Sequence, residues 1–357
     1  MAKIDVLREK IDRIDNQLLA LINRRARLAI QIGREKSRLE GSKHFHVPHR
    51  EREIVERLLN LNSGPFSKSS VKAIFREIFS ATLALEKPLN IAYLGPETTF
   101  THQAAVHQFG RSSAFLPQLA IDLVFKEVEQ DRADYGVVPI ENSVEGAVNQ
   151  TLDCFVDTPL LICDEMKMGI SLYLISKLND LKKIKTLYSH PQPFAQSRNW
   201  LSQNLSDVEL VETSSTAQAA ILAVKNPLSA ALAAKLAAEH YKLNVLAEKI
   251  EDHTENFTRF LVLTKGSAKK ARLNKTSIMF SIKDESGALL KNLQEFARNK
   301  INLSKIQSRP LPLRPWEYLF FVDFDGHIDD RKVGMVIESI RKRSLFIKVL
   351  GSYPRKM

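Results

Sequence analysis

The sequence predicts a multidomain chain made of an all-helical block, a two-lobed α/β block and a smaller α+β block. At 357 residues the chain is longer than one ordinary domain. Its first part has helical periodicity throughout, whereas the remainder alternates strand-like and helix-like segments and ends in a βαββαβ order. We place the blocks at 1–88, 89–265 and 276–357, and expect the basic stretch 266–275 to be a linker.

In the helical block, apolar residues recur at alternating spacings of three and four, which is a heptad seam. Arg25 occupies an inward position of this seam, and Lys36 faces the same side about three turns later. Because a buried guanidinium is costly unless an anion meets it, the two cations predict a dianionic ligand inside a helix bundle. The alternative is a register-fixing arginine paired with a glutamate of the seam. The seam residues are Ile4, Leu7, Ile11, Ile14, Leu18, Leu21, Arg25, Leu28 and Ile32.

The length of the seam predicts a homo-oligomer. From about Ile4 to Arg38 it specifies a helix on the order of 50 Å long, at ~1.5 Å per residue. A block of this size cannot cover such a rod by itself, so we expect an intertwined homodimer or a larger assembly. Two further helices, over Arg50–Leu61 and Ser69–Glu86, complete the block.

The middle block has an open α/β pattern that is long enough for two lobes with a cleft between them. Substrate then belongs at the carboxyl ends of the strands. We expect strands at Asn90–Leu94, Tyr135–Ile140, Thr186–Ser189 and Arg259–Thr264, and helices at Ala217–Val224 and the alanine-rich Ala230–Tyr241.

The last block predicts a ferredoxin-like module, because strand and helix patterns follow in the order βαββαβ. The expected elements are Thr276–Ile282, Ala288–Asn299, Leu303–Ser308, Tyr318–Asp323, Asp329–Arg341 and Leu345–Leu350.

Charge and composition narrow the class of protein. The net charge is +11, and residues 1–88 contribute +7 of it with 18 Lys and Arg against 11 Asp and Glu, which favours anionic ligands. No apolar run approaches the ~20 residues of a membrane span, and MAKIDVLREK lacks the apolar core of a signal peptide. Cys154 and Cys163 have no C-x-x-C spacing. We therefore expect a soluble, cytoplasmic protein without a membrane partner.

Two polar clusters in the middle block are candidates for chemistry. The strand that ends at Ile140 leads directly into Glu141 and Asn142, which places a carboxylate and an amide at a strand tip. In the second cluster Thr258 can donate a hydrogen bond, and Arg259 can bind a carboxylate with two N–H groups. A capped turn and a surface pair are the respective alternatives.

The motifs resemble known enzymes. Those of the middle block follow the order found in prephenate dehydratases, the first block resembles the all-helical chorismate mutase, and the last resembles the ACT regulatory domain. Together they resemble the bifunctional chorismate mutase–prephenate dehydratases of phenylalanine biosynthesis. The motifs are YLGPETTFTHQAA (93–105), VVPIENSVEGAV (137–148), YSHPQPFAQ (188–196), SSTAQAA (214–220) and NFTRF (256–260), with LREKID (7–12), RRARLA (24–29) and RERE (50–53) before them and ESGALL (285–290) and KIQSRP (305–310) after them.

The resemblance implies an intertwined helical mutase domain, a two-lobed dehydratase domain like that of periplasmic binding proteins, and a ferredoxin-like ACT domain. Chorismate would rearrange to prephenate by a pericyclic shift, and prephenate would lose water and carbon dioxide to give phenylpyruvate. L-phenylalanine would be the feedback inhibitor. Neither reaction requires a metal or another cofactor.

For the mutase site the resemblance implies that Arg25 holds a carboxylate of chorismate and that Lys36 meets its ether oxygen. Arg8 lies roughly 100° from Arg25 around the helix, so it cannot easily serve the same site; the resemblance implies that it reaches the partner subunit's site. Glu51 would bind the substrate hydroxyl, and Arg50 adjoins it.

Thr82 and Glu86, one turn apart, would reach the same pocket. A carboxyl group that faces the ether oxygen must be protonated to donate a hydrogen bond. We therefore expect mutase activity to fall as pH rises unless the pKa of Glu86 is raised. Val47 stands where some relatives have an aspartate beside the hydroxyl.

For the dehydratase site the resemblance assigns the central role to Thr258, with Arg259 anchoring the substrate and Phe260 shaping the pocket. Thr98 replaces a glycine of the motif, so its backbone must avoid a positive φ or bear strain. Further expected site residues are Glu141, Asn142, Ser189, Gln196, Ser215 and Thr216.

For the effector site, free amides where Gly287, Ala288 and Leu289 begin a helix would receive the carboxylate of phenylalanine. The alternative is a purely structural dimerisation module. Residues of the second effector motif are Gln307, Ser308, Arg309 and Pro310, with Gln307 replacing a glutamate.

Three other functions fit the sequence less well than the two enzyme activities: a metal site, a DNA-binding regulator and a solute-binding protein. His44, His46 and His49 lie within six residues but have no carboxylate or thiol at a metal-ligand spacing. A DNA-binding regulator would fit the basic helices, yet no helix-turn-helix pattern is present and part of the charge lies on the seam. A solute-binding protein would fit two lobes but would need an export signal. We expect no nucleic-acid partner.

Overall fold

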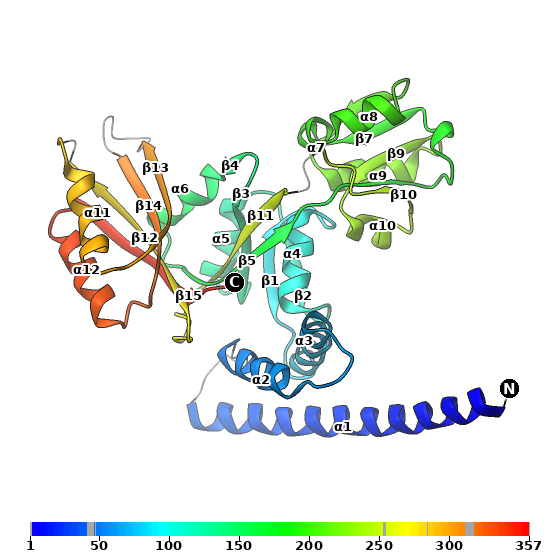
Figure 1. Cartoon of the computed structure of the whole chain (residues 1–357), viewed down its shortest axis with the longest axis horizontal. Helices are drawn as coiled ribbons and strands as arrows, with labels where there is room; N and C mark the ends of the chain where they lie inside the picture. Colours follow the sequence, from blue (N-terminus) through cyan, green and yellow to red (C-terminus); the bar gives the residue numbers. More distant parts are fainter. Residues whose placement is uncertain are drawn as a thin grey trace. The chain divides into compact units, whose positions relative to one another are not determined.

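The computed structural model describes residues 2–40, 46, 48–252, 255–283, 285–310 and 318–356, except for a few side chains near the end of the first helix. It divides into two compact units, one of residues 1–89 with 109–114 and one of 90–108 with 115–357 (Figure 1). No helix among the described residues is long and apolar enough to cross a bilayer.

The described residues of the first unit form three helices, as the sequence predicts. They are α1 (Ala2–Glu40), α2 (Pro48–Leu61) and α3 (Lys68–Ala84). The side chain of Ser67 caps α3 by accepting from the amide of Ser70 at 3.1 Å. Residues 109–114 join this unit, because the amides of Arg111 and Ser112 donate to the side chains of Glu77 and Ser80 on α3.

The first lobe of the second unit is built on a mixed sheet with the order β2-β1-β3-β11-β5, to which β4 adds at β3. Strands β1 and β3 are parallel, whereas β11 is antiparallel to both β3 and β5. Its elements are β1 (Asn90–Leu94), α4 (Phe100–Phe109), β2 (Ala114–Gln118), α5 (Ile121–Glu129), β3 (Tyr135–Asn142), β4 (Gly146–Ala147), α6 (Asn149–Asp157), β5 (Leu161–Gly169) and β11 (Phe257–Thr264).

The second lobe contains a five-stranded sheet with the order β10-β6-β9-β7-β8. The chain enters this lobe after β5 and returns to the first lobe before β11, so two lobes are present as predicted. Its elements are β6 (Tyr173–Ser176), η1 (Leu181–Lys183), β7 (Thr186–Ser189), α7 (Pro191–Gln196), α8 (Arg198–Asn204), β8 (Glu209–Glu212), α9 (Thr216–Lys225), β9 (Ser229–Ala233), α10 (Lys235–Tyr241) and β10 (Asn244–Glu248).

The prediction of a single helix over Ala230–Tyr241 is wrong. Ser229–Ala233 forms the central strand β9, buried at every position, and only Lys235–Tyr241 is helical. Alanine favours helices intrinsically, but a short run of small residues also fits a strand that is covered on both faces. Burial in the sheet therefore outweighs the local preference.

The C-terminal module has the predicted βαββαβ order, and its antiparallel sheet has the order β13-β14-β12-β15. Helices α11 and α12 cover one face of the sheet, where Phe280, Phe296 and Val336 belong to the core. The other face shares a core with the first lobe through residues such as Met279 and Tyr353. The elements are β12 (Asn274–Ile282), α11 (Ala288–Arg298), β13 (Leu303–Pro310), β14 (Tyr318–Asp325), α12 (Arg331–Arg341) and β15 (Phe346–Pro354).

Gly351 and Lys348 make two of the contacts that hold the module against the first lobe. A Cβ atom at Gly351 of β15 would overlap the backbone of Ile162 of β5, so the glycine allows a close approach of the two strands. The ammonium group of Lys348 donates to the carbonyl oxygens of Phe155, Val156 and Thr158 at the end of α6, at 2.8, 3.1 and 2.5 Å. A cation is favoured there because it satisfies the last carbonyls of the helix.

Candidate active sites

In the helical unit, Arg25 projects from α1 toward α3. Its guanidinium donates to Thr82 Oγ1 at 3.2 Å and lies 4.9 Å from the ring centroid of Phe79. Thr82 donates its own proton to the carbonyl of Ile78 at 2.6 Å, which leaves its oxygen free to accept from Arg25. Partial burial lowers the pKa of Arg25, and the negative charge of Glu51 opposes this shift. The result is a positioned, partly desolvated cation.

The carboxyl group of Glu86 reaches back to the same helix. A Cβ atom at Gly33 of α1 would overlap the Glu86 carboxylate, so the glycine leaves room for it. Glu51 lies beside His46, with 3.4 Å between Oε2 and Nε2. The side chain of Lys36 and all of Val47 lie outside the described residues. The structure thus brings Arg25 and Thr82 together, places Glu86 against α1 and leaves Glu51 within electrostatic range of Arg25.

Arg8 and Arg50 are not part of this cluster. Arg8 is 74% exposed and pairs with Asp5 of its own helix at 3.4 Å. Arg50 donates to Glu53 at 3.0 Å and is also exposed. Among the described residues of one chain, neither guanidinium has a hydrogen bond or ion pair with the Arg25 cluster.

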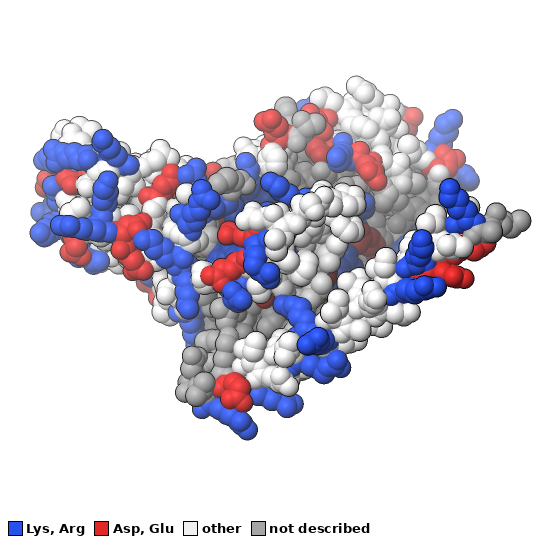
Figure 2. Space-filling model, turned by 60° about the horizontal axis from the view of Figure 1, so that its bottom comes forward, with Lys and Arg blue, Asp and Glu red and all other residues white. Residues whose placement is uncertain are grey.

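The seam of α1 is exposed in the single chain. Its eight apolar members are each 52–61% exposed, and uncharged side chains run along the helix between Lys and Arg (Figure 2). A contiguous apolar stripe of this length marks an interaction surface. Its members are Ile4, Leu7, Ile11, Ile14, Leu18, Leu21, Leu28 and Ile32.

In the first lobe, Thr258 of β11 and Asn142 of β3 form a cross-strand pair. The amides of Val144 and Glu145 donate to Asn142 Oδ1 at 2.9 and 3.2 Å. These two bonds identify Oδ1 as the acceptor, so the atom that faces Thr258 is the NH2 nitrogen of Asn142. It donates to Thr258 Oγ1 at 2.9 Å. Because the Thr258 oxygen accepts this bond, its hydroxyl proton is directed elsewhere and can be donated to a substrate.

The Thr258 pair belongs to a longer chain of amides that joins the two lobes. Asn142 Nδ2 also donates to Asn256 Oδ1 at 2.9 Å, and Asn256 Nδ2 donates to Gln196 Oε1 of α7 at 3.1 Å. Gln196 Nε2 is buried and has no hydrogen-bond partner in the described part of the chain. The chain of bonds therefore has a free donor at each end, which suits an anionic substrate with a departing oxygen. We call Thr258, Asn142, Asn256 and Gln196 the amide chain.

The remaining predicted residues of the second lobe lie at the carboxyl ends of its parallel strands. Ser189 ends β7, is fully buried and donates to the carbonyl of Leu232 at 3.2 Å. Ser215 caps α9 by accepting from the amide of Gln218 at 3.1 Å, and Thr216 begins the helix. The amide of Thr213 donates to the carbonyl of Ser189 at 2.8 Å, so the strand end and the helix start adjoin.

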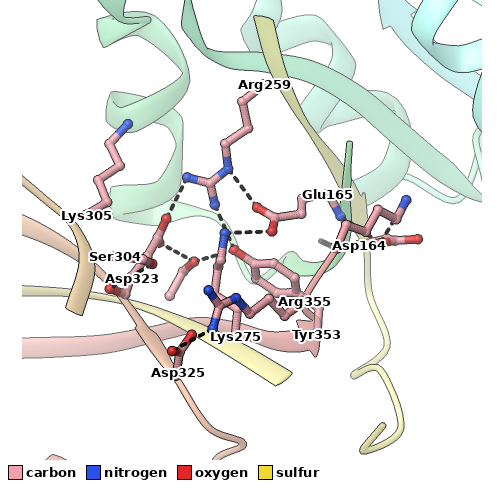
Figure 3. A network of polar contacts seen from close by, with 12 residues as sticks. Asp164, Glu165, Arg259, Lys275, Ser304, Lys305, Asp323, Asp325, Tyr353 and Arg355 are labelled. Atoms are coloured by element: carbon pink, nitrogen blue, oxygen red, sulfur yellow. Dashed lines mark hydrogen bonds and ion pairs between the residues drawn. The ribbon is translucent and has the colours of Figure 1, made fainter. Parts of the chain in front are cut away.

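Arg259 and Glu141 point away from the amide chain, because successive residues of a strand face opposite sides. The guanidinium of Arg259 donates to Glu165 at 2.7 Å, to Asp323 at 2.5 Å and to the Tyr353 hydroxyl at 3.0 Å (Figure 3). Burial disfavours its charge, but the surrounding anionic groups outweigh this and raise the pKa of Arg259. The expected anchor for a substrate carboxylate is therefore bound to carboxylates of the protein. Phe260 is a core residue, 1% exposed.

Thr98 has a positive φ, which is the strained one of the two backbone conformations considered for it. Its φ is +68°, which is unfavourable for a β-branched residue. Its side chain is fully buried, and its amide donates to Nδ1 of His102 at 3.0 Å. The turn of the motif therefore keeps its glycine-like backbone despite the substitution.

The predicted effector residues do not all share one place. Gly287, Ala288 and Leu289 line a hollow of about 370 Å³ together with Tyr318 and Phe320. Ser308 is the cross-strand partner of Phe320, and Pro310 is that of Tyr318. Both therefore lie on the face of the sheet that borders the hollow.

Gln307 and Arg309 alternate to the other face of β13, and Arg309 pairs with Asp153 of α6. Arg309 of the second motif therefore contacts the first lobe instead of the hollow.

Sequence reasoning missed several residues of these sites. Asn256 begins the NFTRF motif, so an amide next to Thr258 was a usable signal. Asp323, Lys305 and Tyr353 gave no local signal, because they meet Arg259 or Glu141 only after the module has packed on the first lobe.

Comparison with known proteins identifies the family. Residues 91–268 match the prephenate dehydratase family, and residues 7–87 match chorismate mutase type II. A bifunctional chorismate mutase/prephenate dehydratase from Aquifex aeolicus is 46% identical over 100% of this chain and 99% of its own length. The corresponding proteins of Pseudomonas aeruginosa and Escherichia coli K12 are 42% and 31% identical, over 99% and 98% of this chain and 98% and 95% of their own.

Solved structures of dehydratases match about three quarters of this chain. A prephenate dehydratase from Arthrobacter aurescens in complex with L-Phe has a TM-score of 0.69 and 33% identity, over 75% of this chain and 90% of that one. The Staphylococcus aureus prephenate dehydratase has a TM-score of 0.65 and 29% identity, over 74% and 100%. This chain therefore belongs to the bifunctional chorismate mutase/prephenate dehydratase family, and it is an enzyme with both activities.

Proposed function

We propose that Thr258 donates the hydrogen bond that assists loss of the ring hydroxyl of prephenate. The observation that carries this proposal is the direction of the Asn142–Thr258 bond, in which the Thr258 oxygen accepts from an amide. Its own proton is then available to the departing oxygen.

The reaction needs little more than positioning. The hydroxyl leaves with a proton as water, the ring carboxylate leaves as carbon dioxide, and the electrons of the broken carbon–carbon bond complete the aromatic ring. One proton is consumed for each prephenate. We propose that the free NH2 of Gln196 and the start of α9, with Ser189, Ser215 and Thr216 around it, hold the carboxylates of the substrate.

Substitution of Thr258 tests this proposal. Thr258→Val keeps the shape but removes the hydroxyl, and we expect dehydratase kcat to fall ~10²–10³-fold, as for loss of a transition-state donor. Thr258→Ser should retain most of the activity. Mutase activity of the same chain reports on folding and concentration. Equal kcat values for Thr258→Val and wild type would overturn the assignment.

For the mutase we propose that Arg25 and Lys36 bind chorismate, with Thr82, Glu86, Glu51 and Arg50 around it, and that Arg8 acts on the partner subunit's site. The support is the exposed stripe of α1, which a second copy would cover, together with the distance of Arg8 from the Arg25 cluster in its own chain. A pericyclic rearrangement requires only a clamp on the dicarboxylate and stabilisation of charge on the ether oxygen.

Mixing two inactive variants tests the shared site. Arg8→Ala and Arg25→Ala chains, allowed to exchange subunits, should regain about a quarter of wild-type mutase activity, because half of the dimers are mixed and each mixed dimer has one intact site. No recovery would place Arg8 in its own subunit's site.

Leu18→Glu should prevent dimerisation and abolish mutase activity while dehydratase activity remains. Gln17→Glu adds the same charge next to the stripe and is the control. Light scattering gives the mass of each variant. An unchanged mass for Leu18→Glu would refute the α1 interface.

We propose that residues 1–88 form the mutase domain, 89–265 the dehydratase domain, and 276–357 an ACT domain that binds L-phenylalanine as a feedback inhibitor. The hollow at the start of α11 has apolar walls for an aromatic ring. The amide of Ala288 donates to the carbonyl of Glu285 at 3.0 Å, so the amides of Leu289 and Leu290 are the ones that can receive a carboxylate. The A. aurescens relative, crystallised with L-Phe, supports the choice of ligand.

A pair of Gly→Ala substitutions tests the effector site. Gly287 has a φ of +79°, so Gly287→Ala strains the turn before α11 and should weaken L-phenylalanine binding, measured by calorimetry. Gly266→Ala, where a Cβ meets open space, is the control. Equal affinities in both variants would place the effector elsewhere.

A further inference from the structure

Two cross-strand pairs in the first lobe lie next to each other along β3 and β11. Thr258 pairs with Asn142, and Arg259 pairs with Glu141. The first pair belongs to the amide chain, whereas the second faces the module. Any shift of Arg259 and Glu141 along their strands must therefore move the backbone that carries Thr258 and Asn142.

The module presents a matching pair to Arg259 and Glu141. Lys305 of β13 and Asp323 of β14 are themselves cross-strand partners. Asp323 Oδ2 lies 2.5 Å from Arg259 Nη1, and Lys305 Nζ lies 2.8 Å from Glu141 Oε2. Arg259 and Glu141 are 4.0 Å apart. Each charge of the lobe thus meets an opposite charge of the module, and we name Glu141, Arg259, Lys305 and Asp323 the four-charge cluster.

The surroundings fix the position of Arg259 further. Glu165 accepts from Arg259 and also pairs with Lys275 of β12 at 2.6 Å. Ser277 donates to Asp323 at 2.5 Å and contacts the Tyr353 hydroxyl at 2.7 Å. Figure 3 shows Arg259 and Glu165 of the first lobe meeting Lys275, Asp323 and Tyr353 of the module. Buried ion pairs of this kind contribute little net stability to the fold. They favour one arrangement of the two strands, because any arrangement that separates the partners leaves a buried charge uncompensated.

The same strands lead to the hollow at α11. Strand β13 pairs with β14 along its length, and Phe320 and Tyr318 of β14 line that hollow. On this strand Phe320 lies three positions before Asp323, and Tyr318 lies five positions before it. A ligand that shifts β14 therefore acts on a strand that holds Arg259.

We propose that the four-charge cluster is the contact through which the C-terminal module sets the geometry of Thr258 and Asn142, with Arg259 and Asp323 as positioning residues. This inference rests on the dehydratase activity proposed for the Thr258 site. It gives Arg259 a different role from that of a substrate anchor, because its donors are occupied by groups of the protein on the far side of β11.

Steady-state kinetics of the full chain distinguish the two roles. We expect Asp323→Asn to lower dehydratase kcat at least tenfold with less than threefold change in the KM for prephenate, and to leave mutase activity unchanged. Arg259→Gln should have a similar effect, and the double variant should be no worse than either single one, because both remove the same contact. Asp325→Asn is the matched control, since Asp325 lies on the same strand but pairs with Arg355 inside the module.

The opposite pattern would overturn the proposal. If Arg259 held the substrate, Arg259→Gln alone would raise KM, Asp323→Asn would stay within twofold of wild type, and their effects would add. Failure of the role proposed for Thr258 is a separate result, because Thr258→Val would then keep the wild-type dehydratase kcat.

A second variant keeps the test valid if a lone buried charge unfolds the protein. Glu141→Gln with Lys305→Gln removes one opposite pair and leaves no unpaired charge. We expect this double variant to bind L-phenylalanine with unchanged affinity in calorimetry, but to keep most of its dehydratase activity when L-phenylalanine is saturating. Inhibition as complete as in wild type would refute the coupling.

Discussion

Gly33→Ala is expected to improve the intrinsic stability of α1 and to damage mutase activity at the same time. A Cβ built at Gly33 would lie 2.7 Å from Cδ and 2.9 Å from Oε1 of Glu86, and it would overlap Oε2. Since non-bonded atoms pack at about 3.5–4.0 Å, the carboxyl group must retreat by roughly 1 Å. It can do so, because it is the end of a flexible side chain.

Misplacement of a catalytic group by about 1 Å can cost ~100-fold in rate, or about 2.7 kcal/mol. Replacement of a helical glycine by alanine gains ~1 kcal/mol in helix propensity. We therefore expect mutase kcat/KM to fall ~100-fold, while the helical unit unfolds at the same temperature or a higher one, and dehydratase activity stays constant.

A chorismate-depletion assay and thermal unfolding by circular dichroism measure both effects. Gly64→Ala is the control, because the nearest atom to a Cβ there is 3.8 Å away. Unchanged mutase kinetics in Gly33→Ala would show that the position of Glu86 against α1 has no part in catalysis.

Three further outcomes are expected. Asn142→Asp replaces the NH2 that donates to Thr258 and Asn256 by an acceptor, so dehydratase kcat should fall ~100-fold with mutase unchanged; wild-type kcat would exclude a role for the amide chain. Burial raises the pKa of the Cys154 thiol to about 11, so in a Cys163→Ser chain its alkylation by iodoacetamide should rise about tenfold per pH unit from pH 8 to 10. A plateau near pH 8.5 would contradict this. If Glu86 donates only when protonated, mutase activity should fall as pH rises, and Glu86→Gln should abolish that fall; identical pH profiles would rule this out.

The sequence was sufficient for features that depend on periodicity or on contiguous motifs. The seam predicted α1, and the alternation of strand and helix patterns predicted two lobes and the βαββαβ module. Thr258 and Asn142 were predicted separately, on two motifs more than a hundred residues apart. That they are cross-strand partners depends on the pairing of β11 with β3, which no local pattern encodes.

Features decided by packing between distant segments could not be predicted. The guanidinium of Arg259 is suited to bind carboxylates, but the packing of the module determines which carboxylates it meets. The strand at Ser229–Ala233 was missed for a related reason, because its state is decided by neighbouring strands on both sides. In both cases tertiary contacts outweigh the preference of the residue itself.

The alanine-rich strand β9 has a mechanical consequence for the second lobe. Its side chains from Ala230 to Ala233 have no solvent exposure, and Ala219, Ala220 and Ala223 of α9 pack in the same core. With so little side-chain bulk between them, backbone layers lie close together and offer few alternative rotamers. Such a lobe resists internal deformation and turns as one piece. Any opening or closing over substrate must then be absorbed in the short connection between β5 and β6, and in the return to β11, where Lys249 already has a φ of +52°.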